Sequence, residues 1–423
     1  PESPAIGEIE KTLTGQGAAV IAVDLKRYFT KAKKEPDCYH LAGALEMLGK
    51  RVQKKLEFAS YTPPILVGYG GGATFAYAAL AQANPNTFRG AISLGFCPDA
   101  QTDRPMCRGA GLTWPAAAGK TVRLQPMDGL EQPWIELHGA TDRACSAKSI
   151  QDFVGKVKQG EMVALPGVGH GFLETTGWQA QLKQAFLRVA DQPHSPDASG
   201  SATQKALALP LQEWTAKPGG DSLAFLVSGD GGWTGVDRKL ASTLAEKGVP
   251  VVGLNSLQYL WNGRTAEGSG KDLERILRAY LAAWNRQDAI LIGYSLGAEV
   301  IPFMANRLPA DLQKKIRLIA LLGPTPNTNL EIRIMEEVGK LAVLPEVEKL
   351  RGSRVLCIYG NGEKDSLCPE IKSGKLGKAT ELPGSHAFGG DYAALADRIL
   401  QEAQPAAERP GAAANGGAGS RRP

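Results

Sequence analysis

Three residue types that together carry out acyl transfer occur in the second half of the chain. Ser295 lies in a Gly-x-Ser-x-Gly pattern at residues 293–297, between a predicted strand at 289–292 and a predicted helix at 298–306. In this setting the glycines allow a sharp turn that lifts the serine hydroxyl above a sheet and leaves the next backbone N–H free to bind an oxyanion. We therefore expect Ser295 to be a nucleophile.

An acid and a histidine follow the serine in the chain order that this kind of site requires. Asp365 follows a predicted strand at 355–359, and His386 lies in a later loop. Glu363 is the alternative acid, and we favour Asp365 because an Asp-x-x-Cys spacing occurs in both halves of the chain. His386 would take the serine proton and pass it to the leaving alcohol while the acid orients the imidazole. This chemistry requires neither a metal nor a cofactor.

An oxyanion hole needs a second N–H donor beside that of Leu296. Residues 223–233 combine a buried-strand pattern with a glycine-rich loop, and we expect the donor to be Gly231 or Gly232. Asp230 in the same loop either recognises a cationic part of the substrate or caps the helix that follows, and the sequence leaves both interpretations open.

The elements that would position these residues occur twice in the chain. Each copy contains a short buried strand, a glycine-rich turn, an apolar-faced helix and a second buried strand, which is a βαβ unit of a parallel sheet. The predicted fold class is α/β, with two tandem α/β-hydrolase-like domains, each a mostly parallel sheet flanked by helices. The matching segments are 64–74 with 289–299, 89–95 with 317–323, 134–145 with 356–368, 165–170 with 382–386, and 17–24 with 248–255.

The first copy lacks a nucleophile. Gly70 stands where the second copy has its serine, although Asp142 and His170 are retained, so we expect this domain to be non-catalytic. Nothing equivalent to the strand and loop at 223–233 precedes it, and we expect the domain to be N-terminally incomplete here. The predicted division is a first domain at 1–190, a Pro/Ser/Gly-rich linker at 191–205, a catalytic domain at 206–403 and a disordered tail at 404–423.

Composition excludes two broad classes. Hydrophobic residues make up 43% of the chain and charged residues 22%, as in a soluble globular protein. No apolar run approaches the ~20 residues that span a bilayer, and a net charge of +5 is too mild for a nucleic-acid binder. Residues 26–55 contain nine Lys or Arg and three Asp or Glu, which indicates either a surface for anionic membranes or a solvated helix face.

The six cysteines indicate disulfides. An even number with short closures favours an oxidising compartment. Four cysteines in the first domain allow three pairings. The pairs that we favour are Cys357 with Cys368, Cys97 with Cys107, and Cys38 with Cys145.

The second domain resembles the AcvB/VirJ family of bacterial virulence proteins. The resemblance rests on residues 228–233, 292–303 and 306–309, and on the loop from Tyr359 through Asp365 to Cys368-Pro. The duplicated first domain looks like the longer, AcvB-type form. The resemblance implies a periplasmic protein of Gram-negative bacteria, soluble or peripherally membrane-associated, that hydrolyses aminoacyl-phosphatidylglycerol and releases lysine or alanine.

Carried over to this chain, the resemblance implies a triad of Ser295, Asp365 and His386. The ammonium group of an aminoacyl ester needs a nearby carboxylate, and Asp230 or Glu299 would supply it, with Trp233 as a further substrate-binding candidate. A type IV secretion protein is an implied partner. The alternatives are a generic lipase or carboxylesterase, and a secretion-associated binding protein in which catalysis is secondary.

Overall fold

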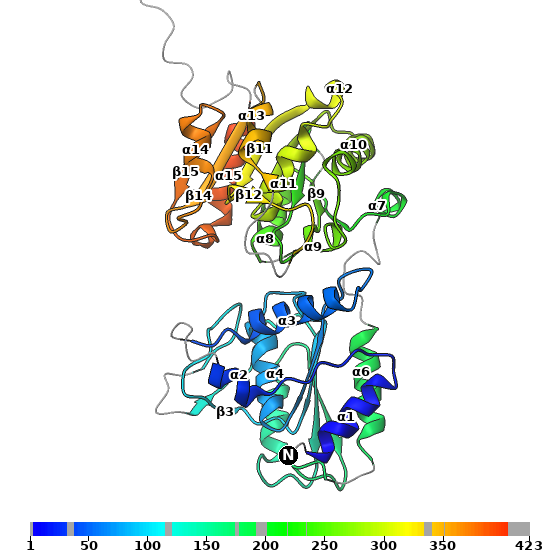
Figure 1. Cartoon of the computed structure of the whole chain (residues 1–423). Coiled ribbons are helices and arrows are strands. Elements are labelled where there is room, and N and C mark those ends of the chain that lie inside the picture. The colour runs from blue at the N-terminus through cyan, green and yellow to red at the C-terminus, as the bar shows by residue number, and fades with distance from the viewer. Residues whose placement is uncertain are drawn as a thin grey trace, which may run out of the picture. The chain divides into compact units, whose positions relative to one another are not determined.

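The chain divides into two compact units in the computed structural model (Figure 1). Unit 1 comprises Pro1–Phe58 and Thr62–Ser195, and unit 2 comprises Ala59–Tyr61 and Pro196–Pro423. The structure describes residues 3–31, 38–114, 121–173, 177–191, 201–217, 219–233, 235–333, 341–350 and 352–404. Most of the predicted linker, 192–200, and the predicted tail beyond residue 404 lie outside these ranges.

Unit 2 is built on a seven-stranded sheet in the order β15-β14-β11-β10-β8-β9-β7. All neighbouring strands are parallel except β7, which pairs antiparallel with β9. The central strands are apolar and buried almost throughout, because helices cover both faces of the sheet. The strands are β7 (Leu211–Trp214), β8 (Ser222–Val227), β9 (Val251–Leu254), β10 (Asp288–Tyr294), β11 (Ile316–Leu322), β14 (Val355–Gly360) and β15 (Lys378–Leu382).

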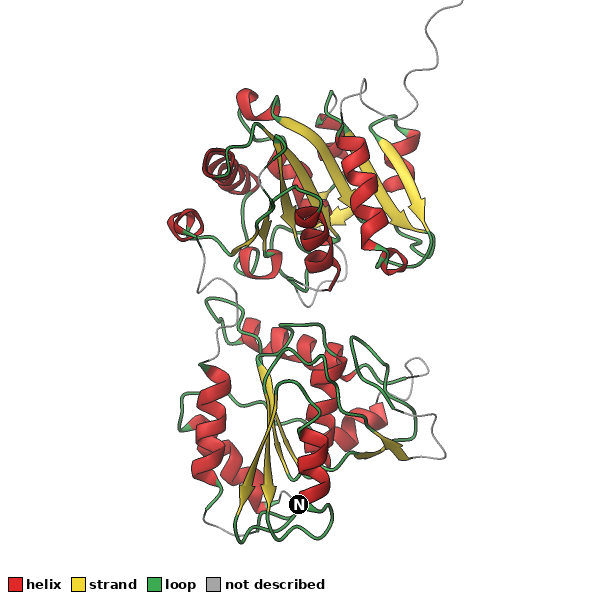
Figure 2. Ribbon diagram, turned by 180° about the vertical axis from the view of Figure 1, so that it is seen from behind, coloured by secondary structure: helices red, strands yellow, loops and turns green. Residues whose placement is uncertain are grey.

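The helices of unit 2 form two layers (Figure 2). One hydrophobic cluster joins the sheet to α10 and α11, and a second cluster on the opposite face joins it to α8 and α15. The larger helices are α8 (Gly235–Glu246), α10 (Ala266–Ala283), α11 (Leu296–Ala305) and α15 (Tyr392–Ala403). Shorter elements are α7 (Ala202–Leu207), α9 (Ser256–Tyr259), α12 (Ala310–Gln313), α13 (Leu344–Lys349), α14 (Cys368–Ser373), a 3-10 turn at Phe388–Gly390, and the pair β12 (Asn327–Thr328) and β13 (Leu341–Ala342).

Unit 1 contains a smaller, four-stranded parallel sheet in the order β1-β2-β5-β6. Helices α3, α4 and α5 cover one face, and α1 and α6 cover the other. The sheet strands are β1 (Ile65–Tyr69), β2 (Gly90–Leu94), β5 (Trp134–Gly139) and β6 (Gly160–Leu165), and β3 (Asp99–Gln101) pairs with β4 (Thr121–Arg123). The helices are α1 (Pro4–Thr14), α2 (Leu25–Lys31), α3 (Leu41–Lys55), α4 (Gly71–Gln82), α5 (Ala147–Val154) and α6 (Gln179–Ala190).

The two sheets share a four-stranded core, which confirms the predicted fold class of two tandem α/β units. Strands β1-β2-β5-β6 of unit 1 correspond in order and direction to β10-β11-β14-β15 of unit 2. The sequence match of 17–24 with 248–255 does not extend to the structure, because 18–24 have no regular structure and expose Val20, Ile21 and Val23, whereas 251–254 form β9. In unit 2 β9 pairs with β8, whereas within the described part of unit 1 β1 has a strand only on its β2 side.

Two other regions differ from the sequence predictions. Helix α7 begins inside the predicted linker, because the Ser201 side chain caps it by accepting from the Gln204 N–H. In the basic stretch 26–55, of which 32–37 lie outside the described residues, Lys50 is buried beside Glu46, and the Lys50 Nζ lies 2.7 Å from Oε1 of Glu46.

Among the helices that the structure describes, none is both long and apolar enough to span a membrane.

The disulfides correct one prediction and confirm another. Cys357 is bonded to Cys368, as expected. The favoured pairing in unit 1 was wrong, since the neighbouring strands β2 and β5 bring together the loops that follow them. The bonds in unit 1 are Cys97 to Cys145 and Cys38 to Cys107.

Candidate active site

Ser295 occupies a sharp turn between β10 and α11. Its backbone is in a left-handed conformation, with φ 52° and ψ −122°, which few residues other than glycine adopt. A Cβ at Gly293 would lie 2.3 Å from the carbonyl oxygen of Gly297, and a Cβ at Gly297 would lie 2.1 Å from the carbonyl oxygen of Val227. Both glycines are therefore required for this close approach, and the turn has the geometry that the pattern predicts.

His386 is paired with Glu363. The Nδ1 atom of His386 hydrogen-bonds to Oε1 of Glu363, and the other carboxylate oxygen accepts from the Gly360 N–H at 2.5 Å. The Glu363 side chain is only 11% exposed, whereas Asp365 is an exposed residue. The preference for Asp365 was wrong on this point, because Glu363 occupies the position beside the imidazole.

The register of the strands explains this correction. Gly360 ends β14 as Gly139 ends β5, and these glycines pair with equivalent residues at the ends of β15 and β6. Glu363 is the third residue after Gly360, and Asp142 is the third after Gly139. Counting back from the cysteine pointed to Asp365, but the loop in unit 2 has two additional residues between the acid and the cysteine.

Two residues that the sequence analysis missed support His386. The Tyr294 hydroxyl donates to the His386 carbonyl oxygen at 3.3 Å, and the two rings lie 5.1 Å apart. Gly323, just after β11, has a positive φ of 63°, and a Cβ there would lie 2.7 Å from Cε1 of His386 and 3.1 Å from Oε1 of Glu363. The end of β11 therefore carries glycine because the imidazole–carboxylate pair lies against it. The available signal was the glycine that follows the apolar run 318–322.

The glycine-rich loop after β8 lies against the serine. A Cβ at Gly229 would be 3.4 Å from the Ser295 Cβ. Of the expected donors, Gly232 is unsuitable because its N–H donates to the Gly229 carbonyl oxygen at 2.9 Å, closing a turn. This leaves Gly231 of the two, together with Leu296, which is the first residue of α11. The α11 N-terminus also contributes a favourable dipole for a developing anion.

The three candidate substrate-binding residues have different surroundings. Trp233 is 4% exposed and packs against Trp214, with ring centroids 5.0 Å apart, so it belongs to the core rather than to a substrate surface. Glu299 is also buried, and its Oε1 accepts from the Thr325 hydroxyl at 2.6 Å and from the Thr325 N–H at 3.2 Å. Asp230 is exposed.

The pKa of Glu299 reflects its burial and its nearness to Asp230. Burial raises the pKa of Glu299, hydrogen bonds from threonine hydroxyls and a backbone N–H oppose that change, and the negative charge of Asp230 raises the pKa further. Asp230 therefore lies close enough to Glu299 and to Tyr294 to influence both pKa values. Glu299 holds the loop after β11 through its hydrogen bonds to Thr325, and Asp230 is the exposed one of the two acidic candidates.

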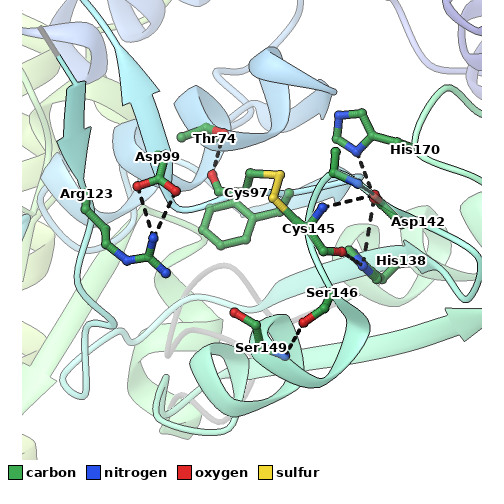
Figure 3. The surroundings of a disulfide bond; sticks show 12 residues. Thr74, Cys97, Asp99, Arg123, His138, Asp142, Cys145, Ser146, Ser149 and His170 are labelled. Atoms are coloured by element: carbon green, nitrogen blue, oxygen red, sulfur yellow. Dashed lines mark hydrogen bonds and ion pairs between the residues drawn. A yellow bond between two sulfur atoms is a disulfide. The ribbon is translucent and has the colours of Figure 1, made fainter.

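Unit 1 repeats much of this site without the serine. His170 Nδ1 hydrogen-bonds to Oδ2 of Asp142 at 2.7 Å, and Oδ1 accepts from the N–H groups of Ala144 and Cys145 at 2.7 and 3.1 Å (Figure 3). Gly70 occupies the turn between β1 and α4, with φ 54° and ψ −122°. An imidazole–carboxylate pair and a nucleophile turn are thus both present, but the turn has no side chain.

A second, buried pair in unit 1 was also missed. Glu136 and His138 lie two residues apart on β5, and both side chains are fully buried. Nε2 of His138 donates to the Cys145 carbonyl oxygen at 3.0 Å, and Nδ1 lies 3.1 Å from Oε1 of Glu136, which also accepts from the Phe96 N–H. Burial raises the pKa of Glu136 to about 7. Their spacing within an otherwise apolar strand was the available signal, since residues i and i+2 share a face.

The class of the second unit follows from these features. A parallel sheet with a serine on a strained strand-to-helix turn, and with a histidine and a carboxylate after two further strands, defines an α/β-hydrolase fold. Residues 221–407 match the family described as bacterial virulence protein (VirJ). The match lies within the second unit, whose sequence motifs predicted this resemblance.

Solved structures of similar fold include several hydrolases. Est1E from Butyrivibrio proteoclasticus, with ferulic acid bound, is 15% identical with a TM-score of 0.35 and covers 45% of this chain and 92% of its own. Proline iminopeptidase from Mycobacterium smegmatis is 12% identical with a TM-score of 0.32, covering 46% and 94%. An alpha-beta serine hydrolase homologue from Coxiella burnetii is 17% identical with a TM-score of 0.32, covering 45% and 89%. None of the curated proteins matches the chain.

Proposed function

We propose that unit 2 is a serine esterase in which Ser295 is the nucleophile, His386 the general base and acid, and Glu363 the carboxylate that orients it. The observation that carries this proposal is the strained turn at Ser295 together with the His386–Glu363 hydrogen bond on the same edge of the sheet. Backbone strain of this kind persists where the surrounding structure enforces it, and it is concentrated at functional turns.

The proposed reaction follows from which ring nitrogen is occupied. Glu363 binds Nδ1 of His386, so Nε2 is the atom that accepts the Ser295 proton. The serine oxygen then bonds to the ester carbonyl carbon, and the oxyanion is held by the N–H groups of Leu296 and of the loop after β8. His386 protonates the leaving alcohol, and water, activated by the same imidazole, releases the acid from the acyl-enzyme.

The substrate that we propose is the aminoacyl ester of phosphatidylglycerol. Its support is the VirJ family match and the exposed carboxylate of Asp230 beside the serine turn, which would attract the ammonium group of an aminoacyl ester. Glu299 is assigned a supporting role, because its carboxylate is engaged by Thr325. The three disulfides favour an oxidising compartment such as the periplasm.

The test compares wild type and Ser295→Ala on lysyl- and alanyl-phosphatidylglycerol in detergent micelles, with unmodified phosphatidylglycerol as the control lipid. Wild type should release free amino acid, and Ser295→Ala should release at least about 10³-fold less. Equal release by both proteins would end the catalytic proposal. Hydrolysis of p-nitrophenyl butyrate without amino-acid release would instead indicate a carboxylesterase with another substrate.

Asp230→Asn tests whether Asp230 binds the ammonium group of the substrate. If Asp230 binds the ammonium group, this variant should raise KM for the aminoacyl lipid about tenfold and leave KM for the neutral p-nitrophenyl ester unchanged. An equal change for both substrates would remove Asp230 from substrate recognition.

A further inference from the structure

The turn at Gly70 in unit 1 has the backbone conformation of a nucleophile turn. Its φ and ψ of 54° and −122° match the 52° and −122° of Ser295. Gly68 allows the same close approach of strand and helix as Gly293 does in unit 2, since a Cβ at Gly68 would lie 2.2 Å from the carbonyl oxygen of Gly72. Unit 1 therefore keeps the conformation in which a side chain at residue 70 would be presented above the sheet.

There is room for a side chain at this turn. A Cβ built on Gly70, Gly71 or Gly72 would meet no atom within 4 Å. The steric reason for a glycine at position 70 is therefore absent, and left-handed backbone strain is tolerated by serine at the equivalent position in unit 2. Loss of the hydroxyl is the chemical difference between the two turns.

The imidazole of His170 is oriented by a buried carboxylate. The Asp142 side chain is fully buried and receives three hydrogen bonds, one from His170 Nδ1 and two from backbone N–H groups. The His170 side chain is 37% exposed, so the ring has one nitrogen bound to a buried carboxylate and an edge open to solvent. This is the same arrangement as His386 on Glu363, and Figure 3 shows the pair beside the Cys97–Cys145 disulfide.

The supports of the histidine are also duplicated. The Tyr69 hydroxyl donates to the Gly171 carbonyl oxygen at 2.7 Å, as the Tyr294 hydroxyl donates to the His386 carbonyl oxygen. Gly95 follows β2 with a positive φ of 73°, as Gly323 follows β11, and a Cβ there would lie 3.6 Å from Nδ1 of His170. Each residue that positions the imidazole in unit 2 has a counterpart in unit 1.

From these observations we propose that unit 1 contains a second, latent acyl-transfer site for carboxylic or phosphonic esters, which keeps the imidazole, the carboxylate and the turn but has no nucleophilic oxygen at residue 70. Serine at this position would react with an electrophilic phosphonate as follows. Its oxygen bonds to phosphorus, the P–F bond breaks and fluoride leaves, and the hydroxyl proton passes to Nε2 of His170. Asp142 binds Nδ1 and favours the imidazolium that forms.

The site should be slower than that of unit 2. In unit 2 the loop after β8 lies beside the serine, whereas the described residues of unit 1 include no strand on that side of β1. Within the described residues of unit 1, the Gly71 N–H is the counterpart of the Leu296 N–H, and the loop after β8 has no counterpart there. Loss of one such donor reduces rates by about 10²–10³-fold, so a hydroxyl introduced by Gly70→Ser should be labelled more slowly than that of Ser295 by that factor.

The experiment uses the full chain and a biotinylated fluorophosphonate, with adducts located by peptide mass. Ser295→Ala should take up no probe in unit 1, and Ser295→Ala/Gly70→Ser should be labelled on residue 70. Adding His170→Ala to that double variant should reduce the labelling rate at least about 100-fold. Ser295→Ala/Gly70→Ala is the matched control for folding, and it should retain the unfolding midpoint of Ser295→Ala within a few degrees.

Three results would overturn the proposal. The first is a folded Ser295→Ala/Gly70→Ser protein that stays unlabelled over hours at millimolar probe. The second is labelling that does not depend on His170, which would indicate an ordinary surface hydroxyl. The third is unfolding of unit 1 by both Gly70 variants, because the inferred space and conformation would then be absent. Wild type reports separately on Ser295, so failure of the proposed function of unit 2 would be seen as an unlabelled wild-type chain.

Discussion

The two units place an imidazole, a carboxylate and a sharp turn at the same points of the same four-stranded core, yet they differ at the residue that would carry out chemistry. Unit 2 has Ser295 where unit 1 has Gly70, with nearly identical backbone angles. The carboxylate is Glu363 in one unit and Asp142 in the other, each third after the end of its strand. The comparison shows that the position of a functional group relative to the sheet is retained even when its residue type changes.

The largest expected difference between the two units is in the effect of replacing their histidines. His386→Ala should lower kcat/KM for ester hydrolysis by about 10³-fold or more, because Ser295 would lose its proposed base. The matched variant His170→Ala should leave kcat/KM within about twofold, since the equivalent turn in unit 1 carries Gly70 in place of a serine. The measurement is p-nitrophenyl ester hydrolysis by the full chain. Equal losses in the two variants would contradict the division of roles between the units.

The assignment of the acid can be tested with neighbouring residues. Glu363→Gln should reduce kcat about 10²–10⁴-fold with little change in KM, since it removes the charge that holds the imidazole and stabilises its protonated form. Asp365→Asn, two residues away in the same loop, should change kcat less than twofold because that side chain is exposed. The reverse ranking of the two variants would restore Asp365 as the acid.

The glycine beneath each histidine provides a smaller, steric test. Gly323→Ala places a Cβ 2.7 Å from the His386 ring at a positive φ, so the ring must shift and kcat should fall about 10–100-fold. Gly95→Ala in unit 1, where the nearest atom would be Cε2 of Phe172 at 3.2 Å, should lower the stability of unit 1 without lowering kcat. Unchanged kinetics of Gly323→Ala, with the protein folded, would argue against close packing of the imidazole there.

The smallest expected effect is a pH dependence confined to unit 1. Burial raises the pKa of Glu136 to about 7. Burial by itself would lower the pKa of His138, but hydrogen bonding to Glu136 and to the Cys145 carbonyl outweighs it and raises that pKa. Both groups hold their protons more tightly in the folded protein than in the unfolded chain. Their contribution to the free energy of unfolding is therefore present at low pH and is lost as pH rises from about 5 to 8. The expected loss is of the order of 2 kcal/mol.

Urea unfolding at pH 5.5 and 8.0, with the amides of β5 followed by pulsed hydrogen exchange, measures this effect. Glu136→Gln should flatten the dependence, while Glu57→Gln, at an exposed glutamate of the same unit, should leave it unchanged. Asp142 acts outside this window, because its pKa is lowered and its contribution is lost only in acid. A stability that rises between pH 5.5 and 8.0 would show that the buried pair has the opposite linkage.

Local patterns in the sequence were sufficient for the architecture and for the nucleophile turn. The Gly-x-Ser-x-Gly spacing implies the turn because only glycine allows the approach of β10 to α11 at Gly293 and of α11 to the end of β8 at Gly297. The internal duplication implied two α/β units because apolar runs separated by helical segments produce parallel strands. The short loop between Cys357 and Cys368 favoured their bond correctly, but the same reasoning failed for Cys97 and Cys107.

What the sequence by itself determined was therefore the fold class, the duplication, the turn at Ser295 and the resemblance of the second half to the VirJ family. Only the tertiary structure decided which side chains of separate loops form pairs, namely His386 with Glu363 and Cys97 with Cys145. It also decided that Trp233 lies in the core. The physical reason is that a turn or a strand depends on neighbouring residues, whereas the partner of a loop side chain depends on where each strand ends in the sheet. A difference of two residues in one loop moves a carboxylate into or out of reach of an imidazole, and sequence spacing alone does not reveal it.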